Sequence, residues 1–410
     1  MLAISGGTAV VQVLGFLLSP IITRLYTPGE FGVLSIYTAI VTILSLGSFK
    51  YERAIPIAED DTSAINIIAL CLLVLTGYTL LISLLFILIG TPILGLLGAS
   101  ELVPYMVLIP IGVFFSGLFL IFMQWALRNK AYKNISKATI FQGIAGNIIK
   151  IGLGLIGVGS LGLLLGRIAS TGMGIARLSG TLVTDNCLRK NISLERILWN
   201  AKRYIRFPLY LSPAIFLVNT GPQLPSLFIA SMFGVNIAGF YGFSIGIVML
   251  PVTLIGNSVG QVFYGEAASI GKNNPLEIKR LAGKMVKNLI LIGLVPLGIL
   301  AWFGPTLFSW VFGSNWYEAG IYARILTLLM LSTLAYYPVS RVFEIFEKQN
   351  ASLLLNTIQF ALIILVFTIG ITLKLDSYST IALYSIAMAF SNALNCFMAR
   401  KVLNNEIEGV

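Results

Sequence analysis

The chain has 410 residues, of which 57% are hydrophobic and only 10% charged, and its formal net charge is +11. Soluble domains carry about 25% charged residues, so this composition excludes the ordinary soluble classes. Nucleic-acid binding is excluded because no soluble domain is left to present a basic face. With no histidine, the chain can form neither a histidine proton relay nor a histidine metal site.

Apolar stretches long enough to cross a membrane recur along the whole sequence. In the first half they cover about residues 2–22, 31–49, 64–90, 102–126, 138–158 and 160–183. In the second half they cover about residues 208–232, 236–262, 286–311, 321–346, 352–373 and 378–399. Because a spanning helix needs roughly 20 mostly apolar residues, we expect an all-α polytopic membrane protein with about 12 transmembrane helices.

Basic residues cluster in every second gap between these stretches. Of the 27 Lys and Arg residues, 21 lie in gaps near residues 50–53, 128–137, 189–206, 272–287, 341–348 and 400–401. The intervening gaps hold only Arg24, Arg324 and Lys374. By the positive-inside rule the basic side is cytoplasmic, so both termini are predicted to be cytoplasmic.

Two local matches indicate an internal duplication. Leu25–Tyr26, followed by Gly32, resembles Met232–Phe233, followed by Gly239, at an offset of 207 residues; residues 96–98 resemble 311–313 at an offset of 215. We therefore predict an N-terminal six-helix bundle over 1–184 and a C-terminal one over 208–410, in the same orientation. The basic segment 185–207 has apolar residues at helical spacing, which predicts a cytoplasmic amphipathic linker helix on the membrane surface.

Three basic residues, Lys150, Arg167 and Arg177, remain inside predicted spans. Each costs roughly 2.5–3.5 kcal/mol to insert, so each requires a reason. A tight glycine-rich turn joins the fifth and sixth spans and brings Lys150 and Arg167 to similar depth, with no acid in either span. Two unpaired cations at the same depth in the membrane indicate a water-filled cavity that binds an anion. The alternative is that their long side chains reach the membrane interface, and this alternative is favoured for Arg177.

The seventh span is rich in helix breakers. Prolines in it, including Pro213 and Pro222, favour a bent gate helix over a purely structural kink. Intramembrane amides are candidates for the cavity lining, although such groups also serve as interhelical hydrogen bonds. These amides are Asn147, Asn219, Gln223 and Asn257.

The acidic residues and cysteines indicate no catalytic or metal site. All 16 Asp and Glu residues lie in predicted loops or near span ends, whereas a cation-coupled exporter is expected to place a carboxylate near the midplane. The three cysteines have no metal-binding spacing, and no phosphate-binding loop is present. The sequence therefore predicts a protein that is not an enzyme, with no cofactor and no metal.

Several segments carry a family resemblance. Residues Ser5–Ala9, Pro20–Gly32 and Tyr51–Pro56 resemble the start of bacterial oligosaccharide flippases, and Gly313–Ala319 resembles a second motif of that family. These are the O-antigen and polysaccharide repeat-unit translocases of the multidrug/oligosaccharidyl-lipid/polysaccharide exporter superfamily. The resemblance implies two six-helix bundles around a central cavity that opens alternately to each side of the bacterial inner membrane.

The resemblance also implies the cargo, a polyprenyl diphosphate that carries a short glycan. Its diphosphate would pair with Lys150, Arg167 and Arg24. The remaining partners would be membrane lipids and the polysaccharide polymerase and chain-length machinery, and an ion gradient is the candidate energy source. Three alternatives stay open: a cation-coupled multidrug antiporter of the same fold, a membrane glycan polymerase or ligase, and a peptidoglycan-precursor flippase, which would carry extra spans.

Overall fold

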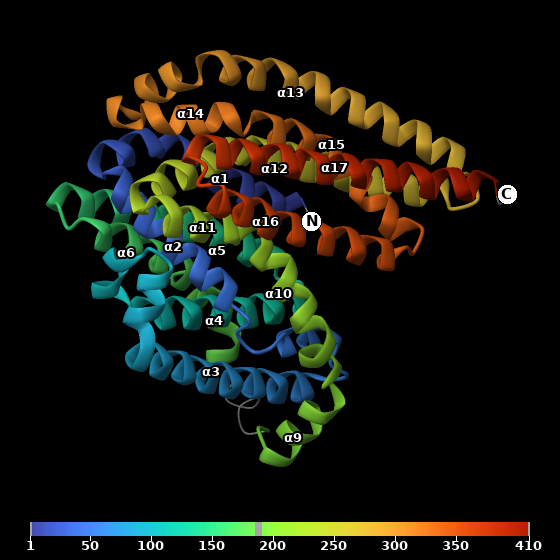
Figure 1. The fold of residues 1–410 in the computed structure, drawn as a ribbon. Helices are drawn as coiled ribbons and strands as arrows, with labels where there is room; N and C mark the ends of the chain where they lie inside the picture. Colours follow the sequence, from blue (N-terminus) through green and yellow to red (C-terminus); the bar gives the residue numbers. More distant parts are fainter. Residues whose placement is uncertain (1, 185–190, 409–410) are drawn as a thin grey trace. The chain divides into compact units, whose positions relative to one another are not determined.

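The computed structural model describes residues 2–184 and 191–408, and the regular structure of these residues is helical throughout (Figure 1). The predicted all-α fold is confirmed. The chain divides into two compact units, Met1–Gly239 and Phe240–Val410.

The first unit contains the helices that line the candidate site. In chain order its elements are α1 (Leu2–Leu25), α2 (Pro28–Leu44), η1 (Tyr51–Ile57), α3 (Asp61–Leu96), η2 (Ser100–Tyr105), α4 (Leu108–Arg128), α5 (Tyr132–Ile156), α6 (Ser160–Gly172), α7 (Ile175–Thr184), α9 (Leu194–Arg203), the π-helical turn η3 (Phe207–Leu211), α10 (Ser212–Thr220), η4 (Gly221–Gln223) and α11 (Leu224–Phe233).

The second unit begins within α12 (Val235–Ile270). Its further elements are α13 (Pro275–Phe312), η5 (Ser314–Trp316), α14 (Tyr317–Ile325), α15 (Thr327–Ile345), α16 (Gln349–Thr372) and α17 (Ser377–Glu408).

Local sequence explains where the helices of the site begin and end. At the start of α2, Thr27 and Glu30 form a capping box in which the Thr27 N–H donates to the Glu30 carboxylate at 2.6 Å, and Pro28 follows the cap. Helix α5 ends at Gly157, whose φ of +76° is the left-handed conformation that glycine adopts readily. The tight turn therefore makes α5 and α6 consecutive antiparallel neighbours, as predicted.

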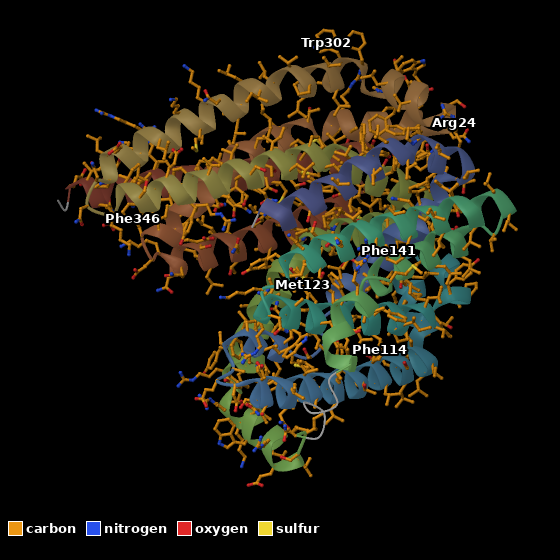
Figure 2. The ribbon with its side chains drawn as sticks, turned by 180° about the vertical axis from the view of Figure 1, so that it is seen from behind. Arg24, Phe114, Met123, Phe141, Trp302 and Phe346 are labelled. Carbon is orange, nitrogen blue, oxygen red and sulfur yellow. The ribbon has the colours of Figure 1, made fainter. Side chains whose placement is uncertain are left out.

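Eight helices are long and apolar enough to cross a membrane, and nine if the bent pair α14–α15 counts as one span, among the residues described. Helices α3 and α13 have 36 and 38 residues, so at 1.5 Å per residue they exceed the roughly 30 Å hydrocarbon core. Their outer surfaces are apolar: Trp302 on α13 is 80% exposed and projects away from the helices (Figure 2). A multi-pass membrane protein follows, while the count of 12 spans stays a prediction.

Two of the predicted spans are broken helices. The sixth is divided into α6 and α7 at residues 173–174. The seventh is divided among η3, α10, η4 and α11, and the interruptions begin next to Pro208 and Pro222. Proline lacks an N–H donor and clashes with the preceding turn, which explains breaks at these positions. A role of the seventh span as a gate stays a prediction.

The predicted linker contains one α-helix among its described residues, 191–207. Helix α9 covers Leu194–Arg203, and its residue Ile197 is buried against a cluster of α3 and η1 side chains. Leu188, the first apolar residue of the predicted linker helix, lies outside the described residues. Helices α10 and α11 pack against α2 in the first unit. The two compact units meet at Gly239, whereas the predicted bundles cover 1–184 and 208–410. The division into these two bundles stays a prediction.

Gly32 and Gly239, which the internal repeat aligns with each other, make reciprocal close contacts. A Cβ on Gly32 would overlap the backbone oxygen of Val235, and a Cβ on Gly239 would overlap the backbone oxygen of Pro28. Pro28 and Val235 are separated by the same 207 residues as Gly32 and Gly239. A two-fold relation between repeats produces such reciprocal contacts. The contact therefore supports the predicted duplication.

Candidate functional site

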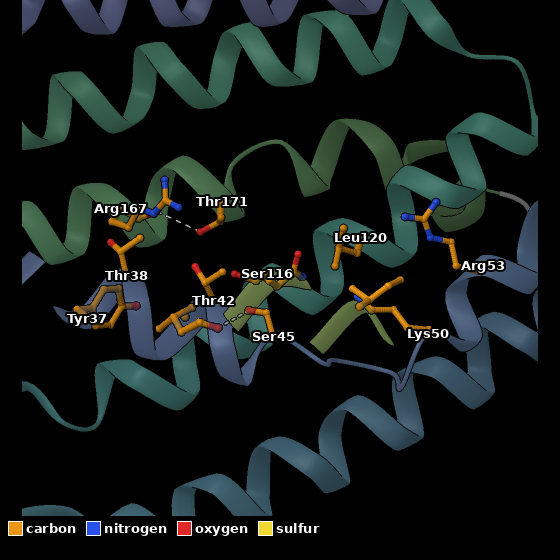
Figure 3. Close-up of a pocket in the computed structure, with 14 residues that line it drawn as sticks. Tyr37, Thr38, Thr42, Ser45, Lys50, Arg53, Ser116, Leu120, Arg167 and Thr171 are labelled. Atoms are coloured by element: carbon orange, nitrogen blue, oxygen red, sulfur yellow. Dashed lines mark hydrogen bonds between the residues drawn. The ribbon is translucent and has the colours of Figure 1, made fainter. Parts of the chain in front are cut away.

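The first unit encloses a cavity of about 270 Å³ (Figure 3). Four helices line it, and each contributes residues four positions apart, because positions i and i+4 share one face of a helix. The lining residues are Tyr37, Thr38, Val41 and Thr42 of α2 and its C-cap Ser45; Gly112, Ser116 and Leu120 of α4; Arg167 and Thr171 of α6; Ile215 and Asn219 of α10; and Lys50 and Arg53 of the segment after α2.

Hydroxyl groups make up much of the wall between the charged residues. The Thr171 hydroxyl donates to the Arg167 carbonyl at 3.1 Å, and the Ser45 hydroxyl donates to the Val41 carbonyl at 2.5 Å (Figure 3). These bonds satisfy the hydroxyl hydrogens within their own helices. The hydroxyl oxygens keep acceptor capacity for water or sugar hydroxyls in the cavity.

Arg167 lies where the sequence predicts a cavity cation. Its side chain is exposed to the cavity at the end formed by Tyr37 and Thr38 (Figure 3). Within the described residues, no carboxylate forms an ion pair with it. Its five N–H donors are therefore available for an anion in the cavity.

Lys150 comes close to Arg167, as the sequence predicts, but does not line the cavity. Its side chain lies over Gly166, where a Cβ would overlap the Lys150 Cγ atom. The Tyr26 hydroxyl donates to the Lys150 backbone carbonyl at 2.6 Å and ties this part of α5 to the residue that follows α1. The Lys150 side chain can therefore strengthen the positive potential near Arg167 without contacting the cavity.

Lys50 and Arg53 line the opposite end of the cavity, where sequence reasoning did not place a site. It assigned both residues to a basic cytoplasmic loop. Lys50 adopts a left-handed backbone with φ of +65°, and its side chain is directed toward the cavity (Figure 3). The available signal was the acidic Glu52 between the two cations, in a segment that already carried the family resemblance.

Of the other predicted site residues, only Asn219 lines the cavity. Arg24 is exposed at the end of α1 and donates to the Pro20 carbonyl at 3.1 Å (Figure 2). Arg177 is exposed on α7, and Asn257 is exposed on α12 in the second unit. Neither Arg24 nor Arg177 lines the cavity, and the role of Asn257 stays a prediction.

The remaining predicted site residues, Asn147, Gln223, Pro213 and Pro222, are not among the residues that line the cavity. The side-chain amide of Asn147 is buried and donates to the Gly143 carbonyl at 2.9 Å, which satisfies it within α5. Gln223 is half-buried at the end of η4. Pro213 and Pro222 are exposed in the first turns of α10 and η4. These positions stay predictions for the substrate path and the gate.

The charge of the cavity wall has one sign. Of the 14 lining residues in the described part of the chain, three are basic and none is acidic. A drug cation or a coupling cation would find no carboxylate in this wall, whereas a phosphate or carboxylate group would find guanidinium and ammonium donors.

Comparison with known proteins identifies the family and the fold. The family model described as polysaccharide biosynthesis protein matches residues 21–320. The capsular polysaccharide biosynthesis protein CapF of Staphylococcus aureus is 30% identical over 132 residues, which is 32% of this chain and 33% of CapF. The chain thus matches about a third of the length of this curated relative.

Solved structures show the same fold at low sequence identity. A multidrug resistance MATE family transporter of the MOP superfamily, in its inward-facing conformation, is 14% identical with a TM-score of 0.75, and the match covers 98% of this chain and 99% of that one. A MOP superfamily transporter from Pyrococcus furiosus is 16% identical with a TM-score of 0.56, over 99% and 95% of the two chains. These matches show that the chain has the fold of the two solved transporters, and the family model places it in the polysaccharide biosynthesis protein family.

Proposed function

We propose, from the premise that this chain belongs to the polysaccharide biosynthesis protein family, that it moves a polyprenyl-diphosphate-linked oligosaccharide repeat unit from the inner to the outer leaflet of a bacterial inner membrane. The observation that carries the proposal is the cavity wall in the first unit, whose described residues include three basic side chains, many hydroxyl groups and no acid.

The diphosphate is the part of the cargo that this wall suits best. A guanidinium group can bind phosphate oxygens through two parallel hydrogen bonds, so Arg167 is the proposed principal contact. Lys150 adds positive charge nearby, because its side chain lies against Gly166, the neighbour of Arg167 in the chain. Attraction between opposite charges is stronger in such a site than in bulk water.

The glycan requires a different kind of surface. Sugar hydroxyls both donate and accept hydrogen bonds, and the lining hydroxyls of Thr38, Thr42 and Ser116 can offer both functions. We propose that access to this cavity alternates between the two sides of the membrane, with both termini cytoplasmic, and that an ion gradient drives the cycle. The polysaccharide polymerase and the chain-length machinery would receive the cargo outside.

A multidrug cation antiporter of the same fold is the main alternative. The fold alone does not distinguish the two functions, because the solved transporters that resemble this chain are only 14–16% identical to it. The positive wall of the cavity favours an anionic cargo over a cationic drug.

The test of the proposed function is export of glycan in a bacterial strain that lacks its own flippase. Surface glycan, normalised to the amount of protein in the membrane, should be restored by the wild-type chain. Arg167→Gln and Lys150→Gln should each reduce it, by about tenfold to a hundredfold for Arg167, because a hydrogen bond to a charged group contributes about 1.5–3 kcal/mol. Arg167→Lys should recover part of the loss.

Lys133→Gln is the matched control. Lys133 lies on the same helix as Lys150 but is exposed in its first turn and does not line the cavity. This variant should export glycan normally. Wild-type export by both the Arg167 and Lys150 variants would refute their proposed role, and failure of the wild-type chain to restore any glycan would refute the function itself.

A further inference from the structure

The cavity of the first unit has two separate cationic ends. Arg167 lies at the end formed by Tyr37, and Lys50 and Arg53 lie at the end beyond Ser45 (Figure 3). From Tyr37 to Ser45 the lining face of α2 extends about 12 Å, at 1.5 Å per residue. A single diphosphate is too short to contact both ends at once. The Lys50 end therefore needs its own explanation.

Lys50 is held close to an internal carboxylate without a tight bond to it. Its side chain is almost fully buried, and its ammonium lies 3.8 Å from the Glu52 carboxylate. Charge-assisted hydrogen bonds are usually about 2.7–2.9 Å long. The other oxygen of Glu52 accepts a hydrogen bond from the Ser48 hydroxyl at 2.5 Å. Glu52 therefore compensates the Lys50 charge only loosely, and the ammonium keeps donors for a ligand in the cavity.

Arg53 has no acidic partner in the parts of the chain that the structure describes. Its side chain is exposed and lines the cavity beside Lys50 (Figure 3). A guanidinium group in this state can bind a phosphate or a carboxylate through two hydrogen bonds.

The segment that carries both cations is fixed to its surroundings. The Tyr51 hydroxyl donates to the Ala201 carbonyl of α9 at 3.1 Å. The Arg128 guanidinium donates to the backbone carbonyls of Ile55 and Ala58 at 3.1 and 2.7 Å. Contacts on both sides of Arg53 therefore hold η1 in place, so that an arriving anion finds a preorganised site.

We propose that Lys50 and Arg53 form a second anion-binding subsite, separate from Arg167, and that Glu52 is the internal counter-ion which an arriving anion replaces at Lys50. The ligand is a phosphate or carboxylate group. It belongs either to the lipid diphosphate before it reaches Arg167 or to an acidic group of the glycan; assigning it to the cargo rests on the proposed function, whereas the subsite itself does not.

The experiment is a calorimetric titration of the purified full-length chain with inorganic pyrophosphate. The wild-type chain should bind two equivalents. Arg53→Gln should remove one and Arg167→Gln the other, with Lys133→Gln as the control for loss of a remote charge. Unchanged stoichiometry in Arg53→Gln would overturn the second subsite.

The counter-ion role has its own variant. Glu52→Gln keeps an oxygen that can accept from Ser48 but removes the competing charge, so binding at the subsite should tighten by about tenfold, or about 1.4 kcal/mol. Unchanged or weaker binding by a folded Glu52→Gln protein, with a wild-type elution profile in size-exclusion chromatography, would overturn this role.

Two further ligands distinguish the sources of the anion. Farnesyl diphosphate carries the lipid diphosphate without a glycan, and glucuronic acid carries a sugar carboxylate without a lipid; glucose is the neutral control. Loss of farnesyl diphosphate binding at this end in Arg53→Gln assigns the subsite to the lipid, and selective loss of glucuronic acid binding assigns it to the glycan. Loss of neither would refute a role in cargo binding, while failure of glycan export with two intact pyrophosphate sites would refute only the proposed function.

Discussion

The reciprocal glycine contact between α2 and the first turn of α12 can be tested by adding one methyl group on either side. In Gly32→Ala the new Cβ would meet the backbone oxygen of Val235, and in Gly239→Ala it would meet the backbone oxygen of Pro28. Neither obstacle is the end of a flexible side chain. The two helices must therefore separate in both variants.

The expected cost is the balance of two effects. Overpacking a tight contact costs typically about 1–3 kcal/mol, and a backbone obstacle places these sites at or above the upper end. Replacing glycine by alanine within a helix returns up to about 1 kcal/mol through helix propensity. The net loss of stability should be about 2 kcal/mol in each variant, and the losses should be similar because the contacts are reciprocal.

The assay is the thermal unfolding midpoint of the detergent-solubilised protein, followed by size-exclusion chromatography after heating. Gly246→Ala on the same helix α12 is the control, since no atom lies within 4 Å of a Cβ at that position, and it should be neutral or slightly stabilising. Glycan export should also fall in the two contact variants, because α2 and its C-cap Ser45 carry five of the cavity-lining residues. Wild-type stability of Gly32→Ala and Gly239→Ala would refute the close contact and its use as support for the duplication.

Two further predictions concern topology and gating. In a background without the native cysteines, a cysteine at Lys130 should react with a membrane-impermeant thiol reagent only from the cytoplasm, and a cysteine at Asn315 only from outside; the reverse pattern would contradict the positive-inside assignment. The double variant Pro213→Ala and Pro222→Ala should insert normally but export glycan more slowly, because it removes the proline at the η4 interruption and the proline at the start of α10, which should make the seventh span harder to bend. Undiminished export, measured per molecule in the membrane, would leave these prolines with a structural role alone.

Sequence reasoning identified some of the cavity-lining residues because a charged residue within an apolar, membrane-length stretch is costly to insert and therefore rare. Arg167 was singled out as an intramembrane cation without an acid in its span, and the structure places it in the cavity wall. Asn219 was singled out beside helix breakers, and it also lines the cavity. The same reasoning singled out Asn147, which the structure shows bonded within its own helix. The N–H groups of an intramembrane amide can donate either to a ligand or water in a cavity or to a backbone carbonyl of a helix. The residue type alone therefore does not distinguish an amide that lines a cavity from one that is bonded within its helix.

Lys50 and Arg53 were missed for a different reason. A count of basic residues per gap treats each gap as a solvated loop, and by that measure these two cations define only orientation. In the structure the chain turns sharply at Phe49 and Lys50, which have φ of +49° and +65°, and leads into η1. The turn directs Lys50 toward the cavity and buries Glu52 beside it. No periodic pattern encodes a turn of this kind.

The sequence by itself determined the class of the protein and its helical stretches, and it singled out Arg167, because the bilayer selects hydrophobic length and penalises charge along the chain, one segment at a time. Tertiary structure alone decided which faces of α2, α4, α6 and α10 meet to form a cavity, that Lys50 and Arg53 line one end of it, and that Arg24 and Arg177 lie outside it. Those outcomes depend on how helices pack against one another. Packing follows from the shapes of side chains that are distant in the sequence, such as Gly166 beneath Lys150 and Gly32 against Val235.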